Sequence, residues 1–228
     1  MEQADLIWMN GDFVAWEDAK VHVLTHALHY GTGVFEGVRA YETERGTAVF
    51  RHQDHVDRLF KSAQMYFMDV PYSKEQIREA TLETISRNSL KSCYIRPVVY
   101  RGAGPMGLYP LDCPVDVCIA VWEWGAYLGD EGKQNGIRGK VSSWRRISPD
   151  SLIPQAKASG QYLNSVLAKI ESHKGGYEEG ILLDPAGNIV AGTRVGDPDA
   201  GGHVQAVFGE DEDRAHAFVD ALGELLDL

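Results

Sequence analysis

The sequence predicts an α+β protein with two domains, and three observations support this. Apolar runs rich in β-branched and aromatic residues are interspersed with segments whose apolar residues recur at helical spacing. A polar, glycine-rich stretch, GAYLGDEGKQNGIRGK, separates two such regions. The 228 residues are 44% hydrophobic, which suffices for one large core or two modest ones. We therefore expect a small α+β domain over 1–124, a linker over 125–136 and a second domain beginning at 137.

The first fifty residues favour strands. The segment LIWMNGDFVAW has two apolar runs around Asn10-Gly11, a dipeptide that accepts positive φ at both hairpin positions, so we expect a β-hairpin. Residues 21–50 are then expected to continue as strands, interrupted at the glycines Gly31, Gly33 and Gly37.

Two helices and two strands should complete the first domain. A helix is predicted over about 53–67 from its apolar spacing. Another is predicted over 74–88, where Ser73 and Gln76 form a capping-box pattern. Strands are expected at 93–100 and 115–124, joined by a loop rich in glycine and proline.

The second region predicts a strand near 138–145, a helix near 161–173 and a hairpin around Asp184 to Asn188, within an incomplete domain over 137–193. The remaining residues, 194–228, differ in composition. Residues 1–194 carry 21 Lys and Arg against 24 Asp and Glu, whereas residues 195–228 carry one Arg against nine acids. This acidic tail ends in EDRAHAFVDALGELLDL, whose apolar spacing predicts an amphipathic helix.

The bulk properties exclude several classes of function. The net charge of −11 disfavours nucleic acid as a partner. No stretch approaches the roughly 18 apolar residues of a membrane span, and the first residues do not resemble a signal peptide. The histidines and the three cysteines lack metal-ligand spacing, so we expect no metal site. We expect a cytoplasmic protein that binds small molecules and other subunits.

The segment IPQAKASGQYLNS is the most informative for chemistry. Lys157 lies between two alanines, whose small side chains would let a bulky ring approach the amine. A lysine withdrawn from water has a lowered pKa and can form an imine with an aldehyde. On composition alone, a solvated surface lysine is the commoner role.

Five segments with characteristic motifs follow one another in a fixed order: HALHYGTGVFEGVRAY at 26–41, VFRHQDHVDRL at 49–59, SCYIRPVVYRG at 92–102, EWGAYLG at 123–129, and SSWRRISPDSLIPQAKASGQYLNS at 142–165. Together they resemble the branched-chain amino acid aminotransferases, which are class IV enzymes of fold-type IV that depend on pyridoxal 5′-phosphate (PLP). The resemblance covers about 1–190 and implies the D-amino acid aminotransferase-like fold.

The resemblance assigns roles to individual residues. It implies that Lys157 forms the Schiff base with PLP and carries the proton between the substrate Cα and the cofactor. It implies that Arg58 binds the cofactor phosphate, a suitable task for a planar donor fork, and that Tyr162 hydrogen-bonds the phenolic oxygen. Without the resemblance, Arg58 would be interpreted as a helix-surface residue and Tyr162 as core packing.

The resemblance also implies a substrate pocket with apolar walls and one cation, which suits an aliphatic amino acid. Tyr94 and Arg96 alternate along one predicted strand and should face the same side. Core packing is the alternative role for the aromatic members. The implied substrate-binding residues are Tyr30, Phe35, Gly37, Tyr94, Arg96, Trp124 and Tyr127.

The pattern fails after the last predicted hairpin. Ala191 occupies the position of a family glutamate that pairs with the pyridine nitrogen and keeps the ring protonated. The family motifs expected further on do not occur in 194–228. We therefore expect a truncated second domain and a C-terminus altered from about 191 by frameshift, fusion or deletion.

The resemblance implies transamination of leucine, isoleucine or valine with 2-oxoglutarate by a homodimer or higher homo-oligomer. Two alternatives remain open. One is an impaired or inactive remnant that acts at most as a binding or interaction protein. The other is a D-amino acid aminotransferase or an aminodeoxychorismate lyase of the same fold.

Overall fold

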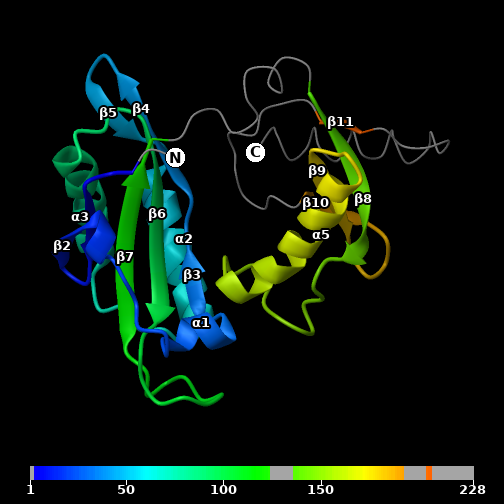
Figure 1. The fold of residues 1–228 in the computed structure, drawn as a ribbon, viewed down its shortest axis with the longest axis horizontal. Coiled ribbons are helices and arrows are strands. Elements are labelled where there is room, and N and C mark those ends of the chain that lie inside the picture. The colour runs from blue at the N-terminus through cyan, green and yellow to red at the C-terminus, as the bar shows by residue number, and fades with distance from the viewer. Residues whose placement is uncertain (1–2, 124–135, 193–203, 207–228) are drawn as a thin grey trace. The chain divides into compact units, whose positions relative to one another are not determined.

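A computed structural model describes residues 3–123, 136–192 and 204–206, and the chain divides into two compact units (Figure 1). The first unit comprises Met1–Trp124 and Ile153–Gln161, and the second comprises Gly125–Leu152 and Tyr162–Leu228. The segment that carries Lys157 therefore packs with the first unit, although it follows the expected linker. The domain limits expected at 124, 136 and 193 stay a prediction.

A seven-stranded antiparallel sheet forms the first unit (Figure 1). Its central strand, β6 (Cys93–Arg101), pairs with β7 (Val115–Trp122) on one side and with β3 and β4 on the other. The predicted N-terminal hairpin is confirmed, since Asn10 and Gly11 have φ angles of 52° and 100°. The other strands are β1 (Leu6–Met9), β2 (Asp12–Ala15), β3 (Gly33–Phe35), β4 (Val38–Thr43) and β5 (Gly46–Val49).

Two helices pack against this sheet and against each other, α2 (His52–Met65) and α3 (Lys74–Arg87). Both lie close to their predicted ranges, and the capping box of α3 is present: Gln76 N donates to Ser73 Oγ, and Ser73 N donates to Gln76 Oε1. The core between helices and sheet contains fully buried aliphatic side chains, among them Leu59, Ile77, Ile95 and Ile119.

The expectation of strands throughout residues 21–50 is wrong at its start. Residues His26–Tyr30 form the short helix α1, which ends where Gly31 adopts a left-handed φ of 68°. The apolar side chains that suggested a strand are exposed here: Val23 is 69% exposed and Leu28 is 61% exposed. Their spacing therefore does not mark a buried face. A short 3₁₀ helix, η1, covers Trp16–Asp18.

The second unit contains a four-stranded sheet in the order β10-β9-β8-β11. Strand β8 runs parallel to β9 and β11, whereas β10 is antiparallel to β9. Helix α5 (Tyr162–Lys174) packs on β8 and β9, as the predicted strand, helix and hairpin required. The strands are β8 (Ile137–Arg145), β9 (Glu179–Leu183), β10 (Ile189–Gly192) and β11 (Val204–Ala206). The helix predicted at the end of the acidic tail lies outside the described residues.

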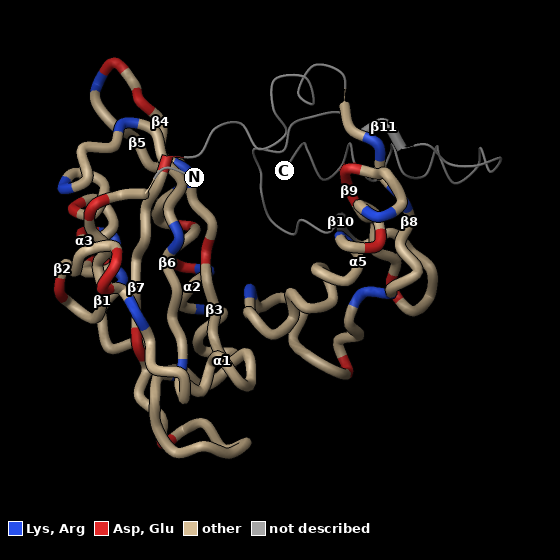
Figure 2. Tube along the Cα trace, viewed as in Figure 1, with Lys and Arg blue, Asp and Glu red and all other residues tan. Residues whose placement is uncertain are grey.

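Acidic and basic residues are interspersed along the described trace of the first unit (Figure 2). None of the helices that the structure describes is both long and apolar enough to cross a membrane.

Candidate functional site

The segment 153–161 places Lys157 against β3 and α2. Phe35 N donates a hydrogen bond to Lys157 O at 3.1 Å, and the next residue, Ala158, forms an antiparallel bridge with Val34. Lys157 N donates to Ser62 Oγ of α2 at 3.0 Å. Both alanines beside Lys157 are buried, whereas the lysine itself is partly exposed. The backbone of Lys157 is therefore anchored by two elements while its side chain remains partly exposed.

The end of this segment is fixed by a close backbone approach. Gly160 N donates to Gly31 O at 3.2 Å, and a Cβ on Gly31 would lie 2.7 Å from Gly160 Cα. Real Cβ atoms do not approach backbone so closely, and the φ of Gly31 is also left-handed. In the 3₁₀ turn η2 (Ser159–Gln161), Gln161 Nε2 donates to Tyr66 Oη at 3.0 Å and to Ile153 O at 2.6 Å.

Replacement of Gly31 by alanine should therefore displace the lysine segment. The left-handed backbone costs an alanine about 1–2 kcal/mol, and the contact with Gly160 adds a cost that must be relieved by moving Gly31 and the segment 153–161 apart. Gly176→Ala is the matched control, because Gly176 has a φ of 80° and an added Cβ there would meet nothing within 4 Å. We expect both variants to lose stability in urea, and only Gly31→Ala to show slower reaction of Lys157 with an aldehyde. Equal reaction rates in the two variants would contradict this expectation.

A buried carboxylate lies one residue after Phe35. Glu36 is fully buried and accepts from Arg58 Nε at 2.5 Å and from Arg58 Nη2 at 2.7 Å. Its Oε2 lies 3.0 Å from His55 Nδ1 and also accepts from Gly37 N at 3.3 Å. Arg58 and His55 lie one turn apart on α2, so both can face Glu36. The carboxylate thus fixes one edge of the Arg58 guanidinium.

The charge state of Glu36 follows from these contacts. Burial is the largest influence and raises its pKa, but the hydrogen bonds from Arg58 and His55 and the nearby positive charges together outweigh it, so the pKa lies below its usual value. The charges of Arg58 and Lys157 act in the same direction. Glu36 is therefore an anion that interacts with both the guanidinium and the amine.

The aromatic ring of Phe35 lies near two cations. Lys157 Nζ is 5.2 Å from the ring centroid and Arg96 Cζ is 4.7 Å from it. Arg96 Nη2 donates to Tyr94 Oη at 2.9 Å, which confirms that these two residues of β6 face the same side. A Cβ on Gly37 would lie 2.0 Å from Tyr94 Oη, so glycine is needed for this approach. The structure therefore brings Phe35, Gly37, Tyr94, Arg96 and Lys157 together.

The remaining sequence-predicted residues are Tyr30 in the first unit, Tyr162 in the second unit, and residues that the structure does not describe. Tyr30 is on α1, where its ring lies 4.5 Å from that of His26. Tyr162 begins α5 in the second unit, near Arg146, whose pKa is lowered by burial and raised by the nearby Tyr162. Trp124 and Tyr127 lie outside the described residues, as does the side chain of Ala191.

Three residues of this site were missed at the level of sequence: Glu36, His55 in this role, and Ser62. A usable signal existed for Glu36, because an acid in the otherwise uncharged run GTGVFEGV must pair with a cation if the run is buried. Nothing in the sequence indicated that Ser62 would accept a hydrogen bond from a residue 95 positions away.

Several of the described histidines make hydrogen bonds to neighbouring backbone or side-chain atoms. His26 contacts Thr32 Oγ1 and Gly107 O, each at 2.8 Å, and His29 contacts Val23 O at 2.8 Å. Among the residues with a described placement, no group of three or more potential ligands could hold a metal ion.

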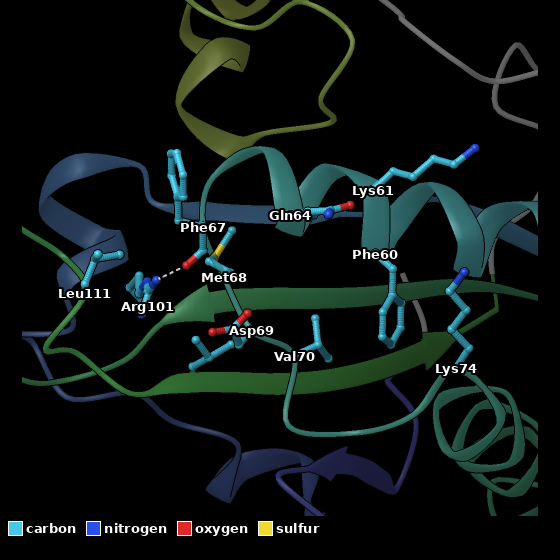
Figure 3. Close-up of a pocket in the computed structure, with 11 residues that line it drawn as sticks. Phe60, Lys61, Gln64, Phe67, Met68, Asp69, Val70, Lys74, Arg101 and Leu111 are labelled. Carbon is cyan, nitrogen blue, oxygen red and sulfur yellow. Dashed lines mark hydrogen bonds between the residues drawn. The ribbon is translucent and has the colours of Figure 1, made fainter.

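A cleft of about 700 Å³ lies in the first unit, apart from the predicted site residues (Figure 3). Arg101 is almost completely buried there and donates to Phe67 O and, at 3.0 Å, to Cys113 O. These bonds tie two loops together, which gives Arg101 a structural role. The cleft is lined by Phe60, Lys61, Gln64, Phe67, Met68, Asp69, Val70, Lys74, Arg101, Leu111 and Val115.

The chemistry of the site suits a phosphorylated aldehyde. It combines a primary amine, which can react with an aldehyde, with a guanidinium, which binds phosphate well. Both groups interact with the same buried carboxylate, and an aromatic ring lies beside the amine. Lys157, Arg58 and Phe35 therefore fit PLP, which the sequence resemblance implies.

Comparison with known proteins is consistent with this chemistry. The family model described as amino-transferase class IV matches residues 33–195. The branched-chain-amino-acid aminotransferase of Pseudomonas aeruginosa is 49% identical over 196 residues, or 85% of this chain and 64% of the relative. That of Escherichia coli K12 is 48% identical over 193 residues, or 84% of this chain and 62% of the relative. The chain thus spans less than two thirds of the length of these relatives.

Solved structures show the same fold. The crystal structure of the Escherichia coli branched-chain amino acid aminotransferase matches with a TM-score of 0.82 at 43% identity, covering 97% of this chain and 76% of the other. The branched-chain aminotransferase of the thermophilic archaeon Thermoproteus uzoniensis, solved with norvaline, matches with a TM-score of 0.79 at 37% identity, covering 96% and 76%. The described chain therefore has the α+β fold of these fold-type IV proteins.

Proposed function

Because this chain belongs to the class IV aminotransferase family, we propose that it is a PLP-dependent transaminase for branched-chain L-amino acids, with 2-oxoglutarate as amino acceptor. One observation supports this most: the Lys157 amine is held beside Phe35 on a segment anchored to β3 and α2. A surface lysine would need neither the flanking buried alanines nor the close approach of Gly160 to Gly31.

The residues of the site would divide the work. When bound, PLP supplies an aldehyde and a ring that withdraws electrons from the substrate Cα. Lys157 would hold the cofactor covalently and then move the proton at Cα. Arg58 would bind the phosphate, and Tyr162 would bind the phenolic oxygen.

The substrate would be held by the residues around Phe35. Arg96 would attract a substrate carboxylate, while Phe35 and Tyr94 would contact an aliphatic side chain. Tyr30, Gly37, Trp124 and Tyr127 complete the proposed substrate-binding set. We also propose a homodimer or higher homo-oligomer in the cytoplasm, where the three free thiols, Cys93, Cys113 and Cys118, would stay reduced.

Chemical labelling tests the proposal. The purified protein is mixed with PLP, reduced with borohydride, digested and analysed by peptide mass spectrometry. We expect a pyridoxyl label on Lys157 at near-stoichiometric yield and only trace labelling of exposed lysines such as Lys91, whose side chain is 74% exposed. A label distributed evenly over the exposed lysines would refute the proposed cofactor site.

A second candidate function is binding of PLP without catalysis of transamination. Ala191 favours it, because no carboxylate side chain is available at this position to keep the ring nitrogen protonated. A separate sample of the protein, loaded with PLP but not reduced, should be tested for conversion of leucine to its 2-oxo acid, with D-leucine as a separate arm. Labelling without conversion of either enantiomer would support the binding protein, and conversion of D-leucine alone would support a D-amino acid aminotransferase.

A further inference from the structure

We infer that Glu36 is a positioning residue, which holds the guanidinium of Arg58 in one orientation for the phosphate of the cofactor. The inference rests on the proposed function, because it takes Arg58 to be the phosphate ligand. It adds a residue that touches neither cofactor nor substrate but determines how the phosphate ligand is presented.

The geometry of the pair carries the inference. The Nε and Nη2 atoms of Arg58 donate to the two oxygens of Glu36, at 2.5 and 2.7 Å. Two parallel bonds of this kind fix the plane of a guanidinium as well as its position. The opposite edge of the Arg58 guanidinium must then point in one direction. A lysine at position 58 would keep the charge but lose this directional control.

The burial of Glu36 and its contacts also fix the orientation of its carboxylate. The carboxylate has no exposed surface, whereas the Arg58 side chain is 40% exposed. Glu36 lies in the break between β3 and β4, and its Oε2 also contacts His55 Nδ1 at 3.0 Å and Gly37 N at 3.3 Å. The buried partner is thus held by three groups, and the partly exposed partner takes its orientation from it.

Stability alone is a weak explanation for this arrangement. The desolvation of a buried carboxylate often cancels the attraction to its partner, so that apolar residues of similar volume would stabilise the fold as well or better. The anion also interacts with the charge of Lys157, although Lys157 lies on a segment more than 100 residues away. Glu36 therefore accepts hydrogen bonds from Arg58, and the charge of Lys157 lowers the pKa of the same carboxylate.

The test compares the affinities of Glu36→Gln for PLP and for pyridoxal, which lacks the phosphate. At metal sites, loss of the outer partner of a ligand weakens binding by about 10- to 100-fold, and we take the same magnitude for the partner of a phosphate ligand. We expect the affinity for PLP to fall by this factor and the affinity for pyridoxal to change less than about twofold. The matched control is Glu42→Gln, which removes an ion-paired but exposed carboxylate from β4 and should change neither affinity. In an Arg58→Ala background, Glu36→Gln should cause no further loss of affinity for PLP.

A second measurement needs no cofactor, and Glu36→Asp takes the place of Glu36→Gln in it if Glu36→Gln folds poorly. In the cofactor-free wild type, the Nε–H proton of Arg58 should give a resolved, exchange-protected NMR signal, assigned by its absence in Arg58→Lys. We expect that signal to be lost in Glu36→Gln and in Glu36→Asp, whose shorter side chain cannot keep both bonds.

The outcomes separate the inference from the proposed function. If the wild type binds PLP through Lys157 and Arg58, but Glu36→Gln binds it equally well, the positioning role is wrong and the function stands. Equal losses for PLP and pyridoxal would also overturn it, because they indicate general damage to the fold. If the wild type binds no PLP, the proposed function fails, and persistence of the Arg58 signal in Glu36→Gln would then overturn the orienting role as well.

Discussion

Lys157→Met should abolish covalent labelling by PLP and slow the half-reaction with leucine by at least about 10²–10⁴-fold, the contribution typical of one acid–base group. Methionine preserves length and apolar character but has no amine, so the anchored segment can keep its backbone bonds to Phe35 and Ser62. Stopped-flow absorbance of the cofactor, together with mass spectrometry of the reduced protein, measures both effects.

The matched control is Lys91→Met, which removes an exposed lysine that pairs only with Glu42 at 2.8 Å among the contacts described for it. It should leave labelling and the half-reaction unchanged. If Lys157→Met retains the rate of the wild type, another base transfers the proton and the role assigned to Lys157 is wrong. If Lys157→Met and Lys91→Met are both inactive, the loss of activity is not specific to the Lys157 amine.

Leu59→Ala should destabilise the first unit by about 2–5 kcal/mol, the range for a large-to-small change in a packed core. Leu59 is fully buried on α2 and follows Arg58 directly, so its packing holds the helix that carries both Arg58 and Ser62. Urea unfolding should be followed by tryptophan fluorescence in a Trp144→Phe background, which leaves buried Trp8 and the other tryptophans of the first unit as reporters. We also expect weaker PLP binding at urea concentrations well below the unfolding midpoint.

Leu82→Ala provides the comparison, because Leu82 is on α3 and is 49% exposed. A substitution at such a surface position usually changes stability by no more than about 0.5 kcal/mol. A similar loss in both variants would mean that Leu59 does not contribute as a core residue. If Leu59→Ala lowers the stability measured by fluorescence but does not weaken PLP binding, packing of the core around Leu59 does not affect the cofactor site.

The two units contribute differently to the proposed chemistry. The amine, the guanidinium, the buried carboxylate and the aromatic ring all belong to the first unit, because Ile153–Gln161 packs there. Tyr162 and the position of Ala191 belong to the second. The labelling experiment measures capture of the cofactor and the half-reaction measures turnover, so the two proposed properties are tested separately.

The sequence by itself determined the local elements and the family. The turn at Asn10-Gly11, the capping box at Ser73 and the alternation of Tyr94 with Arg96 depend on residues close together in the chain, and the structure confirms all three. Local signals failed at residues 26–30, where apolar residues suggested a strand but the chain forms a short helix that Gly31 ends.

Only the tertiary structure decided which distant residues share a site. Glu36 meets Arg58 across 22 positions, and Lys157 N meets Ser62 across 95, because a strand break and a docked segment bring them together. The spacing of residues along the chain does not predict such contacts. Each residue of a pair fits its own strand, helix or loop whether or not the second residue of the pair lies nearby. The position of Lys157 in the motif was readable from the sequence, but the carboxylate and the hydroxyl that surround it depend on the packing of β3, α2 and the segment 153–161.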